Sequence, residues 1–362
     1  MKIHHIVQIV PTLNPGDAIG DFVMLIHRLA EQWGCTSALY AGQTGQGYAA
    51  TVHSLARLPA EFEKPTAVFY HHGTGAPAAE VFASTVASRR YVVYHNVTPP
   101  KLLETVPALA ARSHEGLHQL TMLAQSGARG VAVSQYNAQD LLRAGFHDVE
   151  ILPLAVGDDR RMELELPSHR RESPLRVLHV GRLLPHKAID DVISVFALAC
   201  KSSPKPMNLR IIGSDAESGS HLRTLQNLAE QVAPGCVTFC GKLSDQQLVA
   251  EYAQAHAYLC MSRHEGFCVP IVESMFAGIP VVAAANGAIP ETVGTSGIVL
   301  SDTDPAVFAE ALLSVLTEER LRSAVIAAQR RRAENFSQSK LAERIGQLLD
   351  SGGTPAREQA PS

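Results

Sequence analysis

Short hydrophobic runs alternate with longer amphipathic segments along nearly the whole chain. In the first half, the runs predict strands at 3–10, 37–41, 67–71, 91–94, 131–133 and 149–152. In the second half, they predict strands at 175–180, 208–212, 237–239, 257–261, 280–284 and 297–300. Strands that alternate with helices in this way form parallel sheets covered by helices. The pattern therefore predicts an α/β protein with two doubly wound sheets, one in each half.

The amphipathic segments predict the helices that cover these sheets. They lie at 21–32, 137–144, 188–201, 219–232, 245–254, 269–277, 305–316, 318–334 and 339–349. The segment 158–174 is charged and lacks apolar periodicity, so we expect an exposed connection between two domains. The predicted division is a domain at 1–157, a domain at 172–335, a helix within 336–350 and a flexible tail at 351–362.

Composition narrows the class of protein. A chain of 362 residues fits two domains, and 46% hydrophobic with 18% charged residues indicates a globular protein. The net charge of −4 argues against a nucleic-acid-binding protein, which is expected to be basic. The sequence contains no run of eighteen apolar residues, so no membrane span is predicted. The first ten residues resemble a buried strand more than a signal peptide. The cysteines lie mostly in apolar elements, as in reduced cytosolic proteins, so we expect a cytoplasmic location.

The most informative segment, 262–283, contains two glutamates with seven residues between them. Glu265 follows the strand 257–261 in a Glu-Gly turn, and Glu273 lies on the next helix. The free N–H groups of a helix start attract anions, and here a carboxylate stands on either side of them. The arrangement suits a phosphate between two polyols, as in a nucleotide sugar. The alternative is that both glutamates only favour the helix dipole, but Glu273 lies beyond the first turn.

This segment resembles the paired-glutamate signature, E-x7-E, of retaining glycosyltransferases of family 4. That family, of the hexosyltransferase class, has the GT-B fold, in which two Rossmann-like domains face each other across a cleft. The resemblance implies that Glu265 faces the transferred sugar and that Glu273 binds the ribose hydroxyls. It also implies that the backbone of Gly266, Phe267 and Cys268 meets the sugar and the diphosphate. Family members usually have glycine where Cys268 stands. The cysteine side chain implies crowding of the site or an altered preference for the transferred sugar.

The resemblance is strong from about 175 to 300 and looser over 1–155. It implies that the first domain binds the acceptor, that the second binds the nucleotide sugar, and that the helix at 339–349 crosses back to the first domain.

Two cations, Arg182 and Lys187, follow the strand 175–180. A diphosphate leaving group needs its growing charge neutralised by a metal or by fixed cations. We expect these two side chains to do so, in place of a metal held by an Asp-x-Asp pair, and the family carries both. The alternative is a solvated pair at a helix start, where cations are unfavourable.

Loops of the first half supply further candidates. Gly16, Asp17 and Ala18 follow the first strand, where the family has a glycine-rich loop beside the sugar. Asp17 could equally be a helix N-cap. His95 ends the fourth strand and matches an active-site histidine of the family, although a histidine that caps a loop is the alternative. His72 holds the same position one strand earlier and is a weaker candidate.

The loop after strand 237–239 and two neighbouring segments complete the set. In the family this loop holds the base, which makes Gly241 and Lys242 candidates. Ser134 is expected to cap a helix rather than to react. Pro290-Glu291 is expected to be a structural helix start.

Cys260, His264 and Cys268 are spaced four apart, which would place them on one face of a helix. Gly266 and Pro270 interrupt the segment, so we expect the side chains not to converge and no zinc to bind. We therefore expect no metal site in this protein.

Together these observations predict a retaining, metal-independent glycosyltransferase of polysaccharide biosynthesis. It would move a sugar from a UDP- or GDP-type nucleotide sugar to a glycan, lipid-linked or small-molecule acceptor, with no cofactor. A lipid-linked acceptor would imply peripheral contact with the inner face of the membrane. The alternatives are a nucleotide-sugar epimerase of the same fold and a non-catalytic GT-B scaffold.

Overall fold

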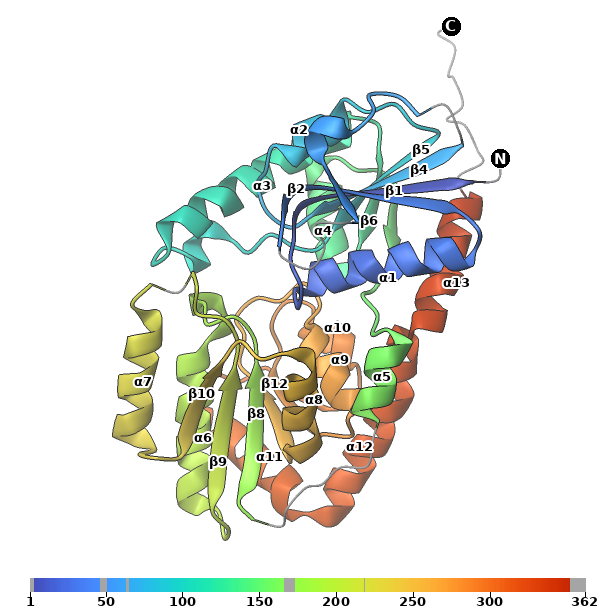
Figure 1. Ribbon diagram of the computed structural model, residues 1–362. Coiled ribbons are helices and arrows are strands. Elements are labelled where there is room, and N and C mark those ends of the chain that lie inside the picture. The colour runs from blue at the N-terminus through green and yellow to red at the C-terminus, as the bar shows by residue number, and fades with distance from the viewer. Residues whose placement is uncertain (1–2, 46–50, 63–64, 166–172, 218, 352–362) are drawn as a thin grey trace, which may run out of the picture.

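The protein contains two parallel sheets, one in each half of the chain (Figure 1). The computed structural model describes residues 3–45, 51–62, 65–165, 173–217 and 219–351. The first sheet has the order β3-β2-β1-β4-β5-β6-β7 and the second the order β10-β9-β8-β11-β12-β13. Every pair of neighbouring strands is parallel. The prediction of two doubly wound α/β sheets is confirmed.

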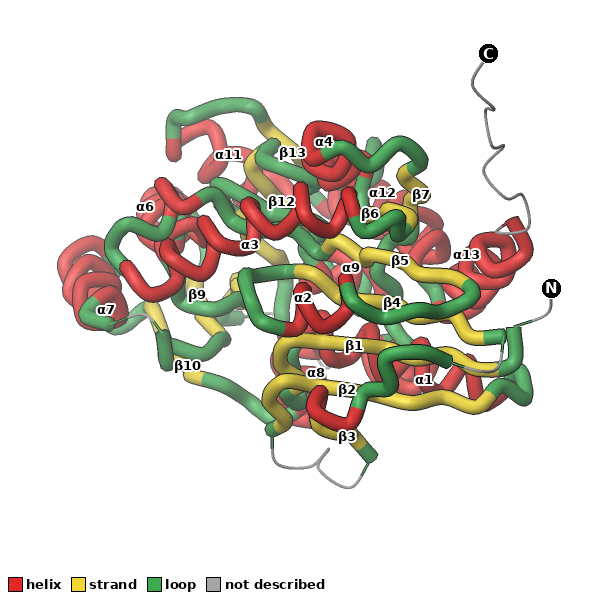
Figure 2. The backbone as a smooth tube through the Cα atoms, turned by 90° about the horizontal axis from the view of Figure 1, so that it is seen from above, coloured by secondary structure: helices red, strands yellow, loops and turns green. Residues whose placement is uncertain are grey.

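The strands of the first sheet are β1 (His5–Leu13), β2 (Thr36–Thr44), β3 (Val52–Ser54), β4 (Thr66–His72), β5 (Arg89–Tyr94), β6 (Arg129–Ala132) and β7 (Val149–Ile151). Those of the second are β8 (Leu175–Val180), β9 (Met207–Ile212), β10 (Val237–Gly241), β11 (Ala257–Cys260), β12 (Val281–Ala284) and β13 (Ile298–Leu300). Figure 2 shows β2, β1, β4 and β5 side by side from above. Each predicted strand overlaps an observed one, and the short edge strand β3 is an addition.

The helices of the first half are α1 (Ala18–Gln32), α2 (Ala78–Ala83), α3 (Pro107–Gln125), α4 (Gln135–Ala144) and α5 (Asp158–Leu164). Those of the second half are α6 (Ile189–Ser202), α7 (His221–Val232), α8 (Asp245–Gln254), α9 (Val269–Phe276), α10 (Ile289–Val293), α11 (Pro305–Thr317), α12 (Glu319–Ala333) and α13 (Gln338–Ser351). The sequence did not predict α2, α3 or α5, and it indicated α10 only through the expected helix start at Pro290-Glu291.

The prediction of an exposed connection over 158–174 is wrong for its first part. Asp158–Leu164 forms α5, which packs against α8 and α9 and buries Leu164. Asp158 and Asp159 lie in its first turn, where acidic residues favour the helix dipole. One buried side chain in two helical turns is too weak a pattern to show periodicity. Residues 166–172 lie outside the described part of the chain.

Helix α13 lies beside the first sheet although it follows the second in sequence (Figure 1). Leu341, Ile345 and Leu348 are buried, and the hydroxyl of Tyr91 on β5 donates to the carbonyl of Leu348 at 3.2 Å. These contacts support the expected crossing helix within 336–350. The domain limits at 1–157 and 172–335 stay a prediction, and the tail at 352–362 lies outside the described residues.

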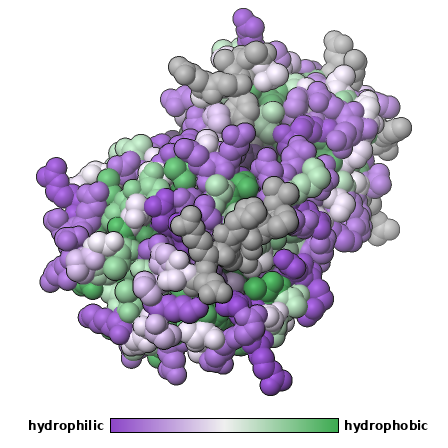
Figure 3. Space-filling model, turned by 60° about the horizontal axis from the view of Figure 1, so that its bottom comes forward, coloured by the Kyte–Doolittle hydropathy of each residue, from purple (hydrophilic) through white to green (hydrophobic). Residues whose placement is uncertain are grey.

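Each sheet reverses its strand order at one point, between β1 and β4 in the first and between β8 and β11 in the second. Ligands of doubly wound sheets bind outside the carboxyl ends of the strands at such a switch point. The loops that leave these four strands begin near Asn14, Gly73, Gly181 and Met261, and they carry most of the predicted site residues. On the face in Figure 3, small hydrophobic groups are scattered among hydrophilic residues.

Candidate active site

The two switch-point loops of the second sheet bring Lys187 and Glu265 together. Lys187 Nζ lies 2.7 Å from Glu265 Oε1, and their side chains are 18% and 9% exposed. Burial alone would lower the pKa of Lys187, but the adjacent carboxylate outweighs this effect and raises it. The ammonium group is therefore charged at neutral pH and lies at the end of the sheet.

Arg182 lies apart from this ion pair. It is exposed, and its Nη1 lies 3.0 Å from Glu217 Oε2. The other carboxylate oxygen of Glu217 lies 2.5 Å from Nη2 of Arg112, which belongs to α3 in the first half. The structure therefore separates the two predicted cations: Lys187 pairs with Glu265, the first glutamate of the motif, and Arg182 joins an ion triad between the halves.

Glu273 is buried on α9 and is held from two other helices. Arg160 on α5 donates from Nε to Glu273 Oε1 at 2.9 Å, and the hydroxyl of Tyr252 on α8 donates to Oε2 at 2.8 Å. Burial and the nearby carboxylate raise the pKa of Tyr252 well above its usual range. Nothing local in the sequence distinguished Arg160, because it lay in the segment expected to be an exposed connection.

Gly266 is one of the points at which the second half touches the first. A Cβ atom there would lie 2.4 Å from Asn96 Cβ and 2.7 Å from the carbonyl oxygen of His95. On the same contact, His264 Nε2 lies 2.6 Å from Asn96 Oδ1. Only glycine permits this approach, so the backbone beside Glu265 lies directly against the loop that carries His95.

Phe267 and Cys268, which directly precede α9, are both buried. Phe267 is buried, and its ring packs edge-on against Phe336 at 5.2 Å between centroids. Its carbonyl accepts a hydrogen bond from Thr292 Oγ1 at 2.7 Å. Cys268 is buried with φ 74°, a conformation that favours glycine, which gives a physical reason for the glycine usual in the resembled family.

The expectation that the spaced cysteines do not converge is wrong for two of them. The Sγ atoms of Cys260 and Cys268 and a carboxylate oxygen of Glu265 lie within 4.8 Å of one another. The loop folds back after β11, so Cys268 at the start of α9 returns to the strand end. His264 turns instead to Asn96, and Lys187 already supplies a positive charge to Glu265.

One Asp-x-Asp sequence does occur, at Asp302-Thr303-Asp304. Asp302 Oδ1 accepts from the backbone N–H groups of Thr303 and Asp304 at 2.7 and 2.9 Å. Asp304 Oδ1 accepts from the N–H of Ala306 at 2.9 Å. Both carboxylates therefore cap the turn before α11.

The loop of Gly16, Asp17 and Ala18 faces the second half across the site. Lys242 Nζ donates to the carbonyl of Pro15 at 2.9 Å and passes close to Gly16. Asp17 is solvent-exposed, but surrounding protein raises the pKa of its carboxyl, against the opposing effects of Arg182 and Lys242. Five predicted residues, Gly16, Asp17, Ala18, Arg182 and Lys242, thus border one region, with Gly241 next to Lys242.

His95 belongs to a row of buried side chains that are joined by hydrogen bonds. Its Nε2 lies 2.9 Å from His71 Nδ1, and the ring of Phe22 packs edge-on against it at 5.8 Å between centroids. Burial lowers the pKa of His95 well below its usual range, and the neighbouring His71 and His72 add to the effect. His95 is therefore neutral at physiological pH.

Ser134 and Glu291, which were expected to be structural, stabilise helix ends. Ser134 Oγ accepts from the N–H of Asn137 at 3.1 Å and caps α4, as predicted. Glu291 accepts from the N–H groups of Gln135 and Tyr136 at 2.8 and 3.2 Å, which ties α10 to the start of α4.

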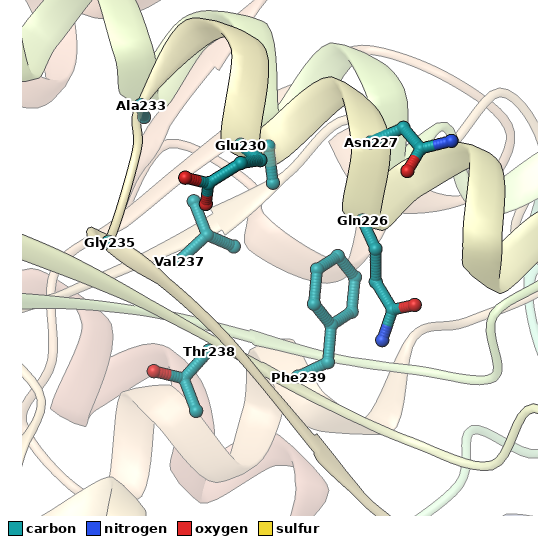
Figure 4. A pocket seen from close by; sticks show the side chains of 9 residues that line it. Gln226, Asn227, Glu230, Ala233, Gly235, Val237, Thr238 and Phe239 are labelled. Carbon is teal, nitrogen blue, oxygen red and sulfur yellow. The ribbon is translucent and has the colours of Figure 1, made fainter.

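A separate hollow of about 440 Å³ lies between α7 and β10 (Figure 4). It is lined by Gln226, Asn227, Ala229, Glu230, Ala233, Gly235, Val237, Thr238 and Phe239. It contains none of the predicted site residues and lies on the flank of the sheet, so we place the active site at the strand ends instead.

Comparison with known proteins shows similarity to glycosyltransferases. Residues 163–332 match the family model described as "Glycosyl transferases group 1". A D-inositol 3-phosphate glycosyltransferase of Corynebacterium efficiens is 28% identical over 275 residues, which is 71% of this chain and 61% of that protein. A GDP-mannose-dependent monoacylated alpha-(1-6)-phosphatidylinositol monomannoside mannosyltransferase of Corynebacterium glutamicum is 30% identical over 180 residues, 47% of this chain and 46% of that protein. The match thus spans less than two thirds of either relative.

Solved structures show the same architecture over nearly the whole chain. Sucrose-phosphate synthase from Thermosynechococcus elongatus superimposes with a TM-score of 0.75 at 18% identity, covering 96% of this chain and 98% of that one. Anabaena HepE in complex with UDP-glucose gives 0.72 at 18% identity, covering 96% and 99%. The chain therefore has the GT-B fold, and its second half carries the sequence match to group 1 glycosyltransferases.

Proposed function

We propose that this protein is a retaining glycosyltransferase that transfers a sugar from a UDP- or GDP-type nucleotide sugar to a sugar-containing acceptor. The observation that carries the proposal is the buried Lys187–Glu265 pair at 2.7 Å, at the carboxyl ends of β8 and β11. The family match over residues 163–332 and the GT-B fold support it.

In the proposed arrangement, the diphosphate lies beside Lys187 and displaces part of its contact with Glu265. Charge grows on the diphosphate as the glycosidic bond breaks, so a cation fixed there stabilises the transition state more than the ground state. Arg182 would add a second cation after leaving Glu217. Glu265, released from Lys187, would accept hydrogen bonds from the sugar hydroxyls.

The retaining course is proposed from the resemblance of the Glu265–Glu273 motif to that of retaining glycosyltransferases. Glu273 is held by Arg160 and Tyr252, and Glu265 is proposed to meet sugar hydroxyls, so no covalent nucleophile is assigned. The departing phosphate itself would assist deprotonation of the acceptor on the same face of the sugar.

The acceptor class is proposed from the relatives. One is named for inositol 3-phosphate and another for a phosphatidylinositol mannoside, so we propose a glycan, glycolipid or phosphorylated polyol. None of the described helices is long and apolar enough to cross a membrane. A lipid-linked acceptor would therefore be reached from the membrane surface.

The first experiment is a thermal-shift screen of UDP-, GDP- and ADP-sugars, since a ligand that binds only the folded state raises the melting temperature. The best donor is then incubated with candidate acceptors, and NMR of the product reports the anomeric configuration. Turnover should persist in excess EDTA if fixed cations neutralise the diphosphate. Loss of turnover in EDTA with recovery in magnesium or manganese would contradict metal independence, and an inverted product would contradict retention.

A further inference from the structure

A chain of three buried side chains crosses the first sheet and ends at His95. Gln8 lies on β1, His71 on β4 and His95 directly after β5, on three neighbouring strands. Gln8 Oε1 lies 3.1 Å from His71 Nε2, and His71 Nδ1 lies 2.9 Å from His95 Nε2. Gln8 and His71 are fully buried, and His95 is 9% exposed.

The donors and acceptors along this chain can be assigned from one end. Gln8 Nε2 donates to the carbonyl of Val23 at 2.9 Å, which fixes the amide so that its Oε1 faces His71. His71 Nε2 must then carry the hydrogen that Oε1 accepts. Burial lowers the pKa of His71 to about 3, so this ring is neutral and its Nδ1 is an acceptor. His95 Nε2 must therefore be the donor of the second hydrogen bond.

This assignment leaves a lone pair on His95 Nδ1. Because His95 is also neutral, the hydrogen on Nε2 excludes one on Nδ1. Nδ1 is buried and has no hydrogen-bond partner among the residues that the structure describes. Buried polar atoms are almost always paired, so an open acceptor at the end of an ordered chain requires an explanation.

A purely structural network is the alternative, and His72 shows how one looks here. His72 is equally buried, but both of its ring nitrogens have partners: the Tyr70 hydroxyl at 3.3 Å and the Gly116 carbonyl at 2.8 Å. That network is closed. The network of His95 is open at its last atom, Nδ1, and the backbone carbonyl of the same residue lies against Gly266.

We propose that Gln8 and His71 are positioning residues that hold His95 in its Nε2–H tautomer, so that Nδ1 accepts a hydrogen bond from a hydroxyl of the bound donor sugar. This inference rests on the proposed function, because it takes a nucleotide sugar as the ligand. This row of three side chains therefore favours a sugar that has a hydroxyl group facing Nδ1. It disfavours a sugar that has only a hydrogen-bond acceptor or a hydrogen atom at that position.

The matched test compares His71→Asn with His71→Leu. The two side chains have similar size, but Asn Oδ1 stands near the place of His71 Nδ1 and still accepts from His95. We expect ¹⁵N NMR of the protein to show the Nε2–H tautomer of His95 in wild type and in His71→Asn. We expect a mixture of tautomers in His71→Leu. Gln8→Leu, which frees the tautomer of His71, should also give a mixture.

Binding provides the functional readout. The probes are UDP, UDP-glucose, GDP and GDP-mannose, measured by calorimetry. For the sugar nucleotide that wild type binds, we expect roughly tenfold weaker binding by His71→Leu, the size of one lost hydrogen bond. His71→Asn should remain within about threefold of wild type, and binding of the nucleotide without its sugar should be unchanged throughout. His72→Asn serves as the control for disturbance of a buried histidine, with no change in the tautomer of His95.

The outcomes separate the two ideas. An Nδ1–H tautomer in wild type, or equal binding by His71→Leu and His71→Asn, would overturn the inference. A wild type that binds none of these sugar nucleotides would instead overturn the proposed function, and the NMR comparison would still test the chain of side chains. If His71→Leu does not fold, Gln8→Leu carries the same test.

Discussion

Arg160 and Glu273 form an ion pair, with Nε 2.9 Å from Oε1, although 113 positions separate them in sequence. The pair joins the connecting helix α5 to α9, which carries the second glutamate of the motif. Tyr252 binds the other carboxylate oxygen at 2.8 Å. Each oxygen still has a lone pair to offer, so ribose hydroxyls can be accepted while the carboxylate is held in place.

The first prediction concerns Glu273. Glu273→Gln should weaken binding of the nucleotide roughly ten- to hundredfold, since a hydrogen bond to a charged group contributes about 1.5–3 kcal/mol. It should also reduce the free energy of unfolding, because Arg160 loses its charged partner while its side chain is 19% exposed. Calorimetry with UDP and GDP and a urea melt measure the two effects.

Arg160→Ala tests the effect on stability. It should lower the free energy of unfolding because it breaks the same ion pair. In a double-mutant cycle, the losses of stability in Glu273→Gln and Arg160→Ala should therefore not add. Nucleotide binding that is unchanged in Glu273→Gln would remove this residue from the site.

The second prediction concerns Lys187. Lys187→Ala should lower kcat about 10²–10³-fold, as expected for the loss of one electrostatic group at the leaving group. It should also destabilise the protein by about 3 kcal/mol, because the buried Glu265 carboxylate would be left without its cation. Single-turnover kinetics at saturating donor and a denaturant melt are the measurements.

Two further variants sharpen this prediction. Glu265→Gln in the Lys187→Ala background should restore stability without restoring turnover. Lys201→Ala, at an exposed lysine on α6, should change neither. A Lys187→Ala enzyme with a raised KM and normal kcat would mean that the lysine only helps binding.

Much of the fold and part of the site could be predicted from the sequence, for a physical reason. Strands of parallel sheets are buried on both faces, so they stand out as apolar runs, and residues after their carboxyl ends meet at one edge. Lys187 and Glu265 follow such runs and form an ion pair, and the loop of Gly16 follows another run and contacts Lys242. The short edge strand β3 and the seven-residue helix α5 have too little buried surface to leave this pattern.

The side-chain pairings could not be predicted in the same way. Arg160, Tyr252 and Gln8 act through partners far away in sequence, and nothing local distinguishes them from other residues of their type. Arg182 was predicted beside Lys187, but Glu217 and Arg112 offer it a partner across the halves. Cys260 and Cys268 converge because the loop between them folds back, which spacing alone did not indicate.

The third prediction uses the close contact at Gly266. Gly266→Ala should lower kcat more than tenfold, because its Cβ would collide with Asn96 Cβ and the His95 carbonyl and force the two halves apart. The sheets have separate strands, so circular dichroism should remain that of a folded α/β protein. Gly346→Ala is the control: nothing lies within 4 Å of its added Cβ, and it should stabilise α13 by about 0.5–1 kcal/mol. Normal turnover by Gly266→Ala would mean that this contact opens during catalysis.

The fourth prediction concerns Asp21, on the first turn of α1. Surrounding protein, with added repulsion from Asp245, Asp17 and Glu273, raises the pKa of Asp21 from 3.8 to about 7, although Arg160 opposes the shift. The folded protein therefore holds this proton more tightly than the unfolded chain. Its contribution to stability is fully present below about pH 4 and is lost as the pH rises through 7.

Asp21→Asn removes this dependence. The melting temperature of the variant should exceed that of wild type, and the difference should grow between pH 5 and pH 8. Because Asp21 is accessible to solvent, we expect a difference of about 1–3 °C at pH 8, from a partly screened repulsion. Asp148→Asn, at an exposed aspartate between α4 and β7, should show no such trend. A constant difference across the pH range would mean that Asp21 titrates alike in both states, and that the carboxylates around α1 do not repel one another.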